Sequence, residues 1–351
     1  MAKDEGARGR VRLRDLARVA GVSEPTVSRA LRDDPQISER TRAFVRQIAE
    51  QLGYVPNAAA QNLALRRSQT VGLMVPDVTD PVHGQIVSGF EDEATKRGYV
   101  VLISNFRYDP SLENRGLRTL ISNQAAGVAI FGGVIDPALV TPRSRGTNLV
   151  FIGPENISSL DQEPRPSTVQ ADDAAGVTVA VTEAVRLGYR RFGFLDGPGV
   201  ASNIRRRTAA IRTLGAAGLD RLRIYKSIGD EFTPVAKKLV HERRELVLCF
   251  DDQRALRLLS AANRLGVKVP EDLSIIGFDD IPFASISNPP LSTIAVPYEQ
   301  MGQMACAMLL EQLSTATPAD PVNVDVQLTF RSTTAPRFAS VRRSLDAIAR
   351  R

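Results

Sequence analysis

Residues 14–31 read Arg14-Asp-Leu-Ala-Arg-Val-Ala-Gly-Val-Ser-Glu-Pro-Thr-Val-Ser-Arg-Ala-Leu31, and they predict two short helices joined by a tight turn. Before the turn, apolar residues recur at the spacing of one helix face, at Leu13, Leu16, Ala17 and Ala20. Gly21 can adopt the left-handed conformation that ends a helix. Ser23 is a favoured N-cap, and Pro25 falls in the first turn of the second helix, where its missing N–H costs nothing.

A third helix follows, with Ser38 as its N-cap, Gly53 at its end and an apolar stripe at Phe44, Val45, Ile48 and Leu52. Helix, glycine turn, helix favours a DNA-binding helix-turn-helix, whose second helix enters the major groove by its N-terminal residues. The residues at that end that do not belong to the apolar inner face are Ser23, Glu24, Pro25, Thr26, Ser28 and Arg29. The guanidinium of Arg29 suits a guanine edge. A plain helical hairpin has the same pattern, so the geometry alone leaves both interpretations open.

The same stretch resembles the headpiece of the lactose/galactose-repressor (LacI-type) family of bacterial transcription regulators. Residues 52–63, Leu52-Gly-Tyr-Val-Pro-Asn-Ala-Ala-Ala-Gln-Asn-Leu63, are similar to the hinge segment of that family, and blocks at 188–194, 266–282 and 289–294 extend the resemblance to about residue 336. In the family this hinge pairs with that of a second subunit in the minor groove. The resemblance therefore implies DNA contacts by Asn57, Ala60 and Leu63, with Leu63 wedged into a base step.

The charge of the chain is uneven. Of 351 residues with a net charge of +6, the first 70 carry 13 Lys/Arg against 8 Asp/Glu, and residues 337–351 carry 5 Arg against one Asp, so the region between is net acidic. A basic end on an acidic body is typical of a nucleic-acid reader joined to another domain, although a solvated basic terminus gives the same pattern. Two Cys and two His, all far apart, provide no metal-finger or disulfide pattern. With no apolar run near membrane length and no apolar leader, we expect a cytoplasmic, nucleoid-associated protein.

From residue 71 the pattern becomes alternating strand and helix. Buried-strand runs at 71–75, 99–103 and 127–131 are followed by a second series at 192–195, 246–250 and 273–278. We therefore predict an all-α helix-turn-helix headpiece on an α/β, two-lobed body like a periplasmic binding protein, with two parallel doubly wound sheets. The expected domains are a headpiece (1–53), a hinge (54–70), a first lobe (71–168 plus 297–328), a second lobe (169–296 plus 329–336) and a basic tail (337–351). We expect residues 325–331 to form the last strand that crosses between the lobes.

Ligands of such sheets bind beyond the carboxyl ends of the strands. The side chains expected there are Asp80, His83, Arg205, Asp251 and Asp279. The resemblance implies that Arg205 and Asp279 bind sugar hydroxyls. It also shows three departures: Asp251 where Asn is usual, Val296 where Gln is common, and Val82 and His83 where an aromatic residue often stands. These departures remove an amide and an aromatic ring and add a carboxylate, which favours an amine, amino sugar or nucleoside over an unmodified hexose or pentose.

These observations predict a ligand-responsive regulator, with repression favoured, that binds a pseudo-palindromic double-stranded operator as a homodimer and needs no cofactor. The tail lacks the sustained heptads of a tetramerisation helix, so a dimer is expected. The alternatives are a cytoplasmic small-molecule-binding protein, a solute receptor and an α/β enzyme. Against an enzyme, the chain has neither a glycine-rich phosphate loop after a strand nor a nucleophile-elbow motif.

Overall fold

The computed structural model describes residues 11–55, 68–132, 148–153, 167–219, 221–315 and 317–337. The chain forms two compact units, Met1–Ser68 and Gln69–Arg351, each with its own hydrophobic core. Most of the expected hinge, including Asn57, Ala60 and Leu63, lies outside the described residues, as does the basic tail from residue 338.

The first unit contains three short helices, α1 (Leu13–Ala20), α2 (Glu24–Leu31) and α3 (Glu39–Gln51). Leu16, Val27 and Val45, one from each helix, are fully buried in a common core. Gly21 has φ +66° at the turn between α1 and α2, as its position predicted. Ser23 and Ser38 cap α2 and α3, since their hydroxyls accept from the backbone N–H of Thr26 and Thr41. The expected helix, turn, helix arrangement is therefore confirmed.

One residue of the predicted stripe on α3 is misplaced. Phe44 is 49% exposed, whereas Val45, Ile48 and Ala49 are buried. A stripe centred on positions 45, 48 and 49 satisfies the helical spacing of three and four residues without position 44. Ala49, and not Phe44, therefore packs in the core of the small unit.

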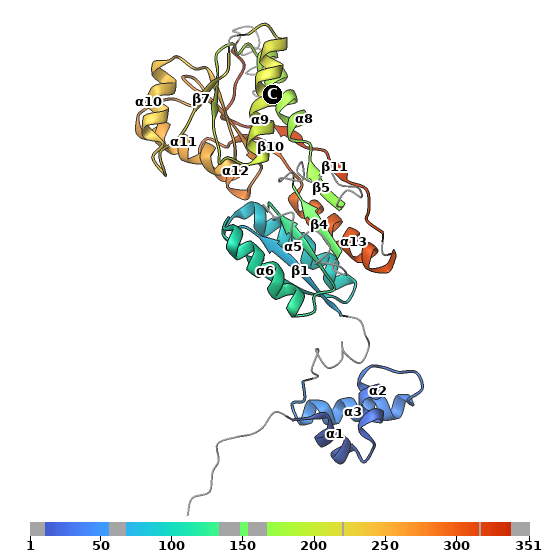
Figure 1. Cartoon of the computed structure of the whole chain (residues 1–351). Helices are drawn as coiled ribbons and strands as arrows, with labels where there is room; N and C mark the ends of the chain where they lie inside the picture. Colours follow the sequence, from blue (N-terminus) through green and yellow to red (C-terminus); the bar gives the residue numbers. More distant parts are fainter. Residues whose placement is uncertain are drawn as a thin grey trace, which may run out of the picture. The chain divides into compact units, whose positions relative to one another are not determined.

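The second unit contains two six-stranded sheets (Figure 1). The strand order of the first is β11 (Val322–Val324), β5 (Ser167–Ala171), β4 (Asn148–Ile152), β3 (Gly127–Phe131), β1 (Thr70–Val75) and β2 (Val100–Asn105), all parallel. The order of the second is β12 (Gln327–Thr329), β10 (Ser292–Ala295), β9 (Ser274–Asp279), β8 (Leu246–Cys249), β6 (Phe192–Leu195) and β7 (Arg223–Tyr225), parallel except for β12.

Helices cover both faces of each sheet. Around the first sheet, α6 (Pro110–Ser122) packs on the face that carries Met74, while α5 (Pro81–Lys96) and α13 (Tyr298–Thr315) pack on the face that carries Val71 and Leu73. Neighbouring residues of β1 thus point to opposite faces, both buried, as in a doubly wound sheet. The second sheet is covered by α8 (Asp173–Arg186), α9 (Ala201–Ala216), α10 (Thr233–His241), α11 (Asp252–Arg264) and α12 (Pro282–Ile286). The predicted fold class is confirmed.

The chain passes between the two sheets three times. It crosses after β5, again between β10 and α13, and a third time between β11 and β12. The expected lobe boundary at residue 168 falls inside β5, which pairs only within the first sheet, so the crossing lies after Ala171. Residues 325–331 do not form one crossing strand: β11 ends at Val324 in the first sheet, residues 325 and 326 make the crossing, and β12 pairs in the second sheet. Because β5 is short and polar, its pattern did not predict a strand.

Candidate functional site

The N-terminal end of α2 is exposed to solvent. Ser23, Glu24, Pro25 and Arg29 are exposed there, and Thr26 and Ser28 are half-buried. The hydroxyls of Ser23 and Thr26 lie 2.8 Å apart, so both take part in the helix cap. Apart from the capping Ser23, the exposed side chains at this end are those of Glu24, Pro25 and Arg29, and Arg29 donates through Nη1 to Gln36 Oε1 at 3.5 Å. A guanidinium on an exposed helix end can bind phosphate or a guanine edge.

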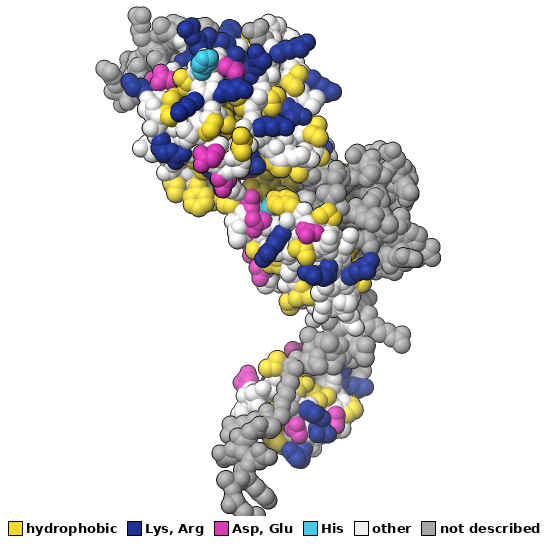
Figure 2. Space-filling view, turned by 60° about the vertical axis from the view of Figure 1, so that its left-hand side comes forward, with side chains coloured by type: hydrophobic (Ala, Val, Ile, Leu, Met, Phe, Trp, Pro, Cys, Tyr) yellow, Lys and Arg dark blue, Asp and Glu magenta, His cyan; other side chains and the backbone are white. Residues whose placement is uncertain are grey.

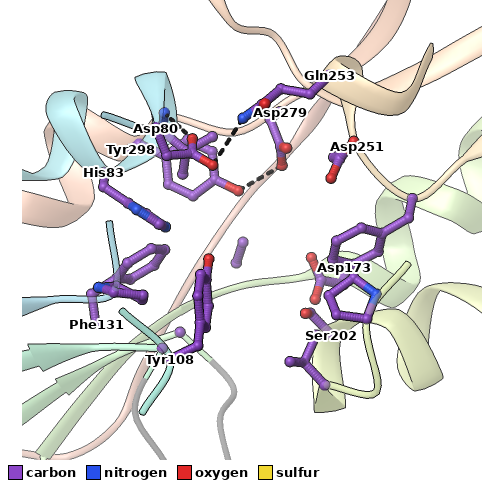
Figure 3. A pocket seen from close by; sticks show the side chains of 18 of the residues that line it. Asp80, His83, Tyr108, Phe131, Asp173, Ser202, Asp251, Gln253, Asp279 and Tyr298 are labelled. Atoms are coloured by element: carbon purple, nitrogen blue, oxygen red, sulfur yellow. Dashed lines mark hydrogen bonds between the residues drawn. The ribbon is translucent and has the colours of Figure 1, made fainter. Parts of the chain in front are cut away.

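The larger unit contains a cavity of about 550 Å³ whose lining comes from both sheets (Figure 3). From the first lobe come side chains of the loops after β1, β2 and β3 and of α5. From the second come side chains that follow β6, β8 and β9. The cavity thus lies at the carboxyl ends of two sets of parallel strands, where open α/β sheets bind ligands.

A buried arginine organises the second-lobe side of the cavity. Arg206, on α9 and 5% exposed, donates through Nε and Nη2 to Asp173 Oδ1 at 3.2 and 3.1 Å. Its Nη1 donates to the carbonyl of Phe250 at 2.7 Å and lies 3.5 Å from Asp279 Oδ1. Burial alone lowers the pKa of Arg206, but the neighbouring carboxyl groups of Asp173 and Asp279 outweigh it and raise the pKa. The guanidinium is therefore a permanent cation.

Asp279 ends β9 with a strained backbone. Its φ is +110°, a backbone conformation that residues other than glycine rarely adopt, and the following Asp280 has φ +57°. Asp280 is held by an ion pair with Arg331 at 2.8 Å. Tyr298, at the second crossing, donates its hydroxyl to Asp279 Oδ1 at 2.7 Å. Burial raises the pKa of Asp279 well above its ordinary value, against the opposing effect of Arg206. The carboxyl group is thus fixed against the cavity by both lobes.

Asp80 and Asp251 each cap a helix and also bind a second side chain. Asp80 caps α5 through Oδ1, which accepts from the N–H of Val82, and its Oδ2 accepts from Gln253 Nε2 at 2.9 Å. That hydrogen bond joins α5 of the first lobe to α11 of the second. Asp251 caps α11 by accepting from the N–H of Arg254 at 2.7 Å, and it also pairs with the Arg254 guanidinium. Both residues therefore belong to the cavity lining and to the helix starts that shape it.

Aromatic rings form the first-lobe wall of the cavity. The His83 ring meets Phe131 edge-on at 5.1 Å and lies 6.4 Å from Tyr108, and Phe131 lies 6.2 Å from Tyr298. The Nδ1 of His83 lies 2.6 Å from the carbonyl oxygen of Asp77, which fixes the ring. The family's aromatic residue is absent at positions 82 and 83, but rings from other parts of the sequence occupy the cavity wall.

The structure places four of the five expected ligand residues in the cavity lining: Asp80, His83, Asp251 and Asp279. The fifth, Arg205, does not line the cavity, and Arg206 takes its place. Arg206 shares the buried stripe of α9 with Ala209, Ala210 and Leu214, whereas Arg205 lies off it. The spacing of those apolar residues was the signal that favoured position 206. Tyr108, Phe131, Asp173 and Tyr298 were also missed, since each lies in a loop or at an element end without a motif.

Among the described residues no group of three or more His, Cys, Asp or Glu side chains is placed to hold a metal ion. In the same part of the chain, no helix has the length and apolar character needed to cross a membrane. The arrangement of fixed carboxyl groups, a buried guanidinium, an amide and aromatic rings suits a polar ring compound, because such a ligand needs several fixed donors and acceptors beside an apolar wall.

Two family models match the chain. Residues 12–57 match bacterial regulatory proteins of the lacI family, and residues 181–334 match a periplasmic binding protein-like domain. The HTH-type transcriptional repressor CytR of Escherichia coli (strain K12) is 32% identical over 308 residues, which are 86% of this chain and 89% of that protein. The ribose operon repressor of Bacillus subtilis is 34% identical over 304 residues, 85% of this chain and 90% of that protein.

Solved structures show the same fold. The lac repressor dimer bound to operator and an anti-inducer has a TM-score of 0.81 at 24% identity, covering 93% of this chain and 100% of that chain. A LacI family transcriptional regulator from Enterococcus faecium with bound ribose has a TM-score of 0.68 at 22% identity, covering 77% of this chain and 100% of that chain.

Proposed function

The chain belongs to the LacI family of bacterial regulatory proteins, and from this premise we propose that it binds a pseudo-palindromic DNA operator as a homodimer under the control of a small molecule. Its relatives are transcriptional repressors rather than enzymes, so it is a DNA-binding transcription regulator. Repression is the proposed mode of control. The cytoplasm, in association with the nucleoid, is the proposed location.

The observation that carries the proposal is a ligand-sized cavity built from two lobes in the chain that also carries a helix-turn-helix. On the DNA side, α2 enters the major groove, where Arg29 donates to a base edge and Glu24 can accept from cytosine. Ser23, Pro25, Thr26 and Ser28 lie along the same helix end. Asn57, Ala60 and Leu63 of the hinge contact the minor groove in this proposal.

The proposed effector is a sugar, amino sugar or nucleoside-like molecule held by Asp80, His83, Asp251 and Asp279 together with Arg206. Two comparisons support this class. One relative is named for a ribose operon, and one structure of the same fold has ribose bound. The aromatic wall removes the earlier objection to an unmodified sugar, since rings can pack against a pyranose or furanose face.

Exposed apolar side chains support the homodimer. On β2, an edge strand of the first sheet, Val100 is 63% exposed and Ile103 is 44% exposed. On α12 of the second lobe, Phe283 is 54% exposed and Ile286 is 76% exposed. Each lobe thus leaves large apolar side chains uncovered, and Phe283 and Ile286, three residues apart on a helix, share one face. Exposed apolar surface can mark a protein interface, and two-fold dimers are the commonest oligomers.

The experiment that tests the proposal measures operator binding by wild type and by Arg29→Ala, after the site is selected from random duplexes. If Arg29 contacts a base, its loss costs roughly 1–3 kcal/mol and relaxes the preference at one position of each half-site. Arg18→Ala on α1 is the matched control, because that side chain is 80% exposed and lies on another helix. Binding and sequence preference unchanged in Arg29→Ala would refute the proposed docking.

A further inference from the structure

Carboxyl groups outnumber cations in the cavity. Among the described residues that line it, five carry a carboxyl group and two carry a guanidinium: Asp80, Glu113, Asp173, Asp251 and Asp279 against Arg206 and Arg254. Both guanidinium groups already pair with carboxyl groups of the same cavity. Figure 2 shows acidic side chains on both lobes beside the line where the lobes meet. The lining is therefore acidic by count, and its own cations are engaged.

The Asp173 carboxyl group of this lining has a buried oxygen without a hydrogen-bond partner in the described part of the chain. Asp173 is 3% exposed, and its Oδ1 accepts both hydrogen bonds from Arg206. Its Oδ2 has no hydrogen-bond partner among the described residues. In Figure 3 the Asp173 carboxyl group faces the interior of the cavity from the second-lobe side. A buried acceptor left unpaired costs free energy, so this oxygen is a ready position for a donor carried by a ligand.

The opposite wall favours positive charge as well. His83, Tyr108 and Phe131 lie across the cavity from the carboxyl groups of Asp173 and Asp279 (Figure 3). The π faces of aromatic rings attract cations, and the attraction is stronger where water is excluded. A cation between these walls would meet carboxyl groups on one side and rings on the other.

A hydroxyl donor and an ammonium donor differ in how much of the cavity's negative charge they leave uncompensated. Burial raises the pKa of Asp279 and so favours its neutral form, but the other four carboxyl groups of the lining still outnumber its two guanidinium groups. A hydroxyl satisfies the Asp173 oxygen but leaves this remaining surplus uncompensated as the lobes exclude water from the cavity. An ammonium group supplies up to three N–H donors and also neutralises one charge. Because burial of unpaired charge is costly, the cavity should select the ligand that carries the compensating charge.

We propose that the effector carries a protonated amino group on its hydroxyl-bearing ring and that this group donates to Asp173 Oδ2. The ligand class is the amino sugars and similar cationic amino polyols, rather than neutral sugars. This inference rests on the proposed function, since it takes the cavity to be the effector site.

The test uses matched triplets of probes with the purified full-length protein. Each 2-amino-2-deoxyhexose is compared with its parent hexose and with its N-acetyl derivative by calorimetry and by thermal shift. We expect at least one amine to bind at least tenfold more tightly than its parent, and its N-acetyl form to lose that advantage because the charge is gone. The proposal is overturned if a neutral sugar binds as tightly as its amine, or if no amine binds.

Substitutions then locate the amino group. Asp173→Asn should reduce the preference for the amine over its parent to less than about threefold. Asp251→Asn, which keeps a favoured N-cap on α11, is the second variant should Asp173→Asn not fold, and it should weaken the preference in the same direction. Glu271→Gln is the control with the same loss of charge, because Glu271 is exposed and does not line the cavity. An undiminished preference in both cavity variants overturns the proposal.

The outcomes also separate this inference from the proposed function. A neutral sugar that binds and changes operator affinity would overturn the amine while leaving the ligand-controlled regulator intact. Operator binding that responds to no ligand bound in the cavity would count against the proposed function itself.

Discussion

Arg205 and Arg206 differ by one position on α9, and that position decides which guanidinium enters the cavity. One residue turns the side chain by 100° around the helix, so the two cannot share a face. Arg206 lies on the buried stripe and meets Asp173, Asp279 and the ring of Phe278, whose centroid is 3.4 Å from its Cζ. With three consecutive arginines, a family motif that contains one arginine can be aligned in three ways. Only the apolar residues that follow in the helix show which arginine is buried.

We predict that Arg206→Ala both destabilises the body and abolishes ligand binding. Its loss leaves the carboxyl groups of Asp173 and Asp279 buried without their cation, which costs on the order of 3–5 kcal/mol of unfolding free energy. Urea unfolding measures this cost, and calorimetry with the tightest ligand of the probe panel measures binding. Arg205→Ala is the control and should keep the ligand affinity within about twofold. Loss of binding in Arg205→Ala with binding retained in Arg206→Ala would contradict the assignment.

Two helices of the first lobe approach each other through glycine. A Cβ at Gly89 of α5 would overlap the backbone carbonyl of Glu299, and a Cβ at Gly302 of α13 would overlap the carbonyl of Ile86. Each helix thus presents a glycine to the backbone of the other. Since α13 begins at the second crossing, this contact fixes the position of the crossing relative to the first sheet.

Gly89→Ala should therefore destabilise the body by about 1–3 kcal/mol or more, because a backbone atom cannot move aside as a side chain can. Gly84→Ala in the same helix is the matched control. Gly84 is exposed, and a Cβ there would meet nothing within 4 Å, so this change should stabilise by roughly 0.5–1 kcal/mol. Urea unfolding of both variants tests the difference. Equal effects at the two positions would argue against the close approach of the helices.

The sequence predicted those helices and strands that contain one clear local pattern along their whole length. The apolar runs of β1, β3 and β8 and the serine caps of α2 and α3 were readable, because local chemistry decides them. The short polar strand β5 and the pair β11 and β12 were not, since strands of three to five residues gain their stability from pairing with distant strands. The boundaries of the lobes depend on these short strands, and they were misplaced for that reason.

The cavity was predicted where a residue ends a strand and missed where tertiary structure brings it in. Asp279 ends β9, Asp251 follows β8, and Asp80 lies in the loop after β1, so topology alone placed them at the cavity. Phe131 also ends a strand, β3, but it continues the apolar run of that strand and so did not stand out as a site residue. Tyr108 lies in the loop after β2, and Tyr298 begins α13 at a crossing. Their rings meet only once the sheet order is known, which no local pattern contains. The sequence thus predicted these three acidic residues of the site but not these aromatic residues.

The whole body is two lobes joined by three crossings, and the side chains of the cavity connect those crossings. Asp173 follows the first crossing and Tyr298 the second, and both bind the Arg206 and Asp279 pair. A ligand that reorganises this network would act on the hinge between the lobes. Such a ligand changes DNA binding only as far as it binds the two lobe arrangements with different affinity.

The hydrogen bond from Gln253 to Asp80 links the start of α5 in one lobe with α11 in the other, within the cavity lining. We predict that Gln253→Ala shifts the unliganded protein toward an open arrangement. Loss of one hydrogen bond worth about 1 kcal/mol changes the closed-to-open ratio roughly fivefold. The apparent ligand affinity falls with the closed fraction, and small-angle scattering should give a larger radius of gyration.

Linkage fixes the direction in which Gln253→Ala changes operator affinity relative to the effector. A ligand that closes the lobes and a variant that opens them bias the same equilibrium in opposite directions, so Gln253→Ala must change operator affinity opposite to the effector. Gln300→Ala, at an exposed position of α13, is the matched control and should change neither scattering nor affinity. A Gln253→Ala protein that shifts operator affinity in the same direction as the ligand would mean that lobe closure is not what the operator-binding unit senses.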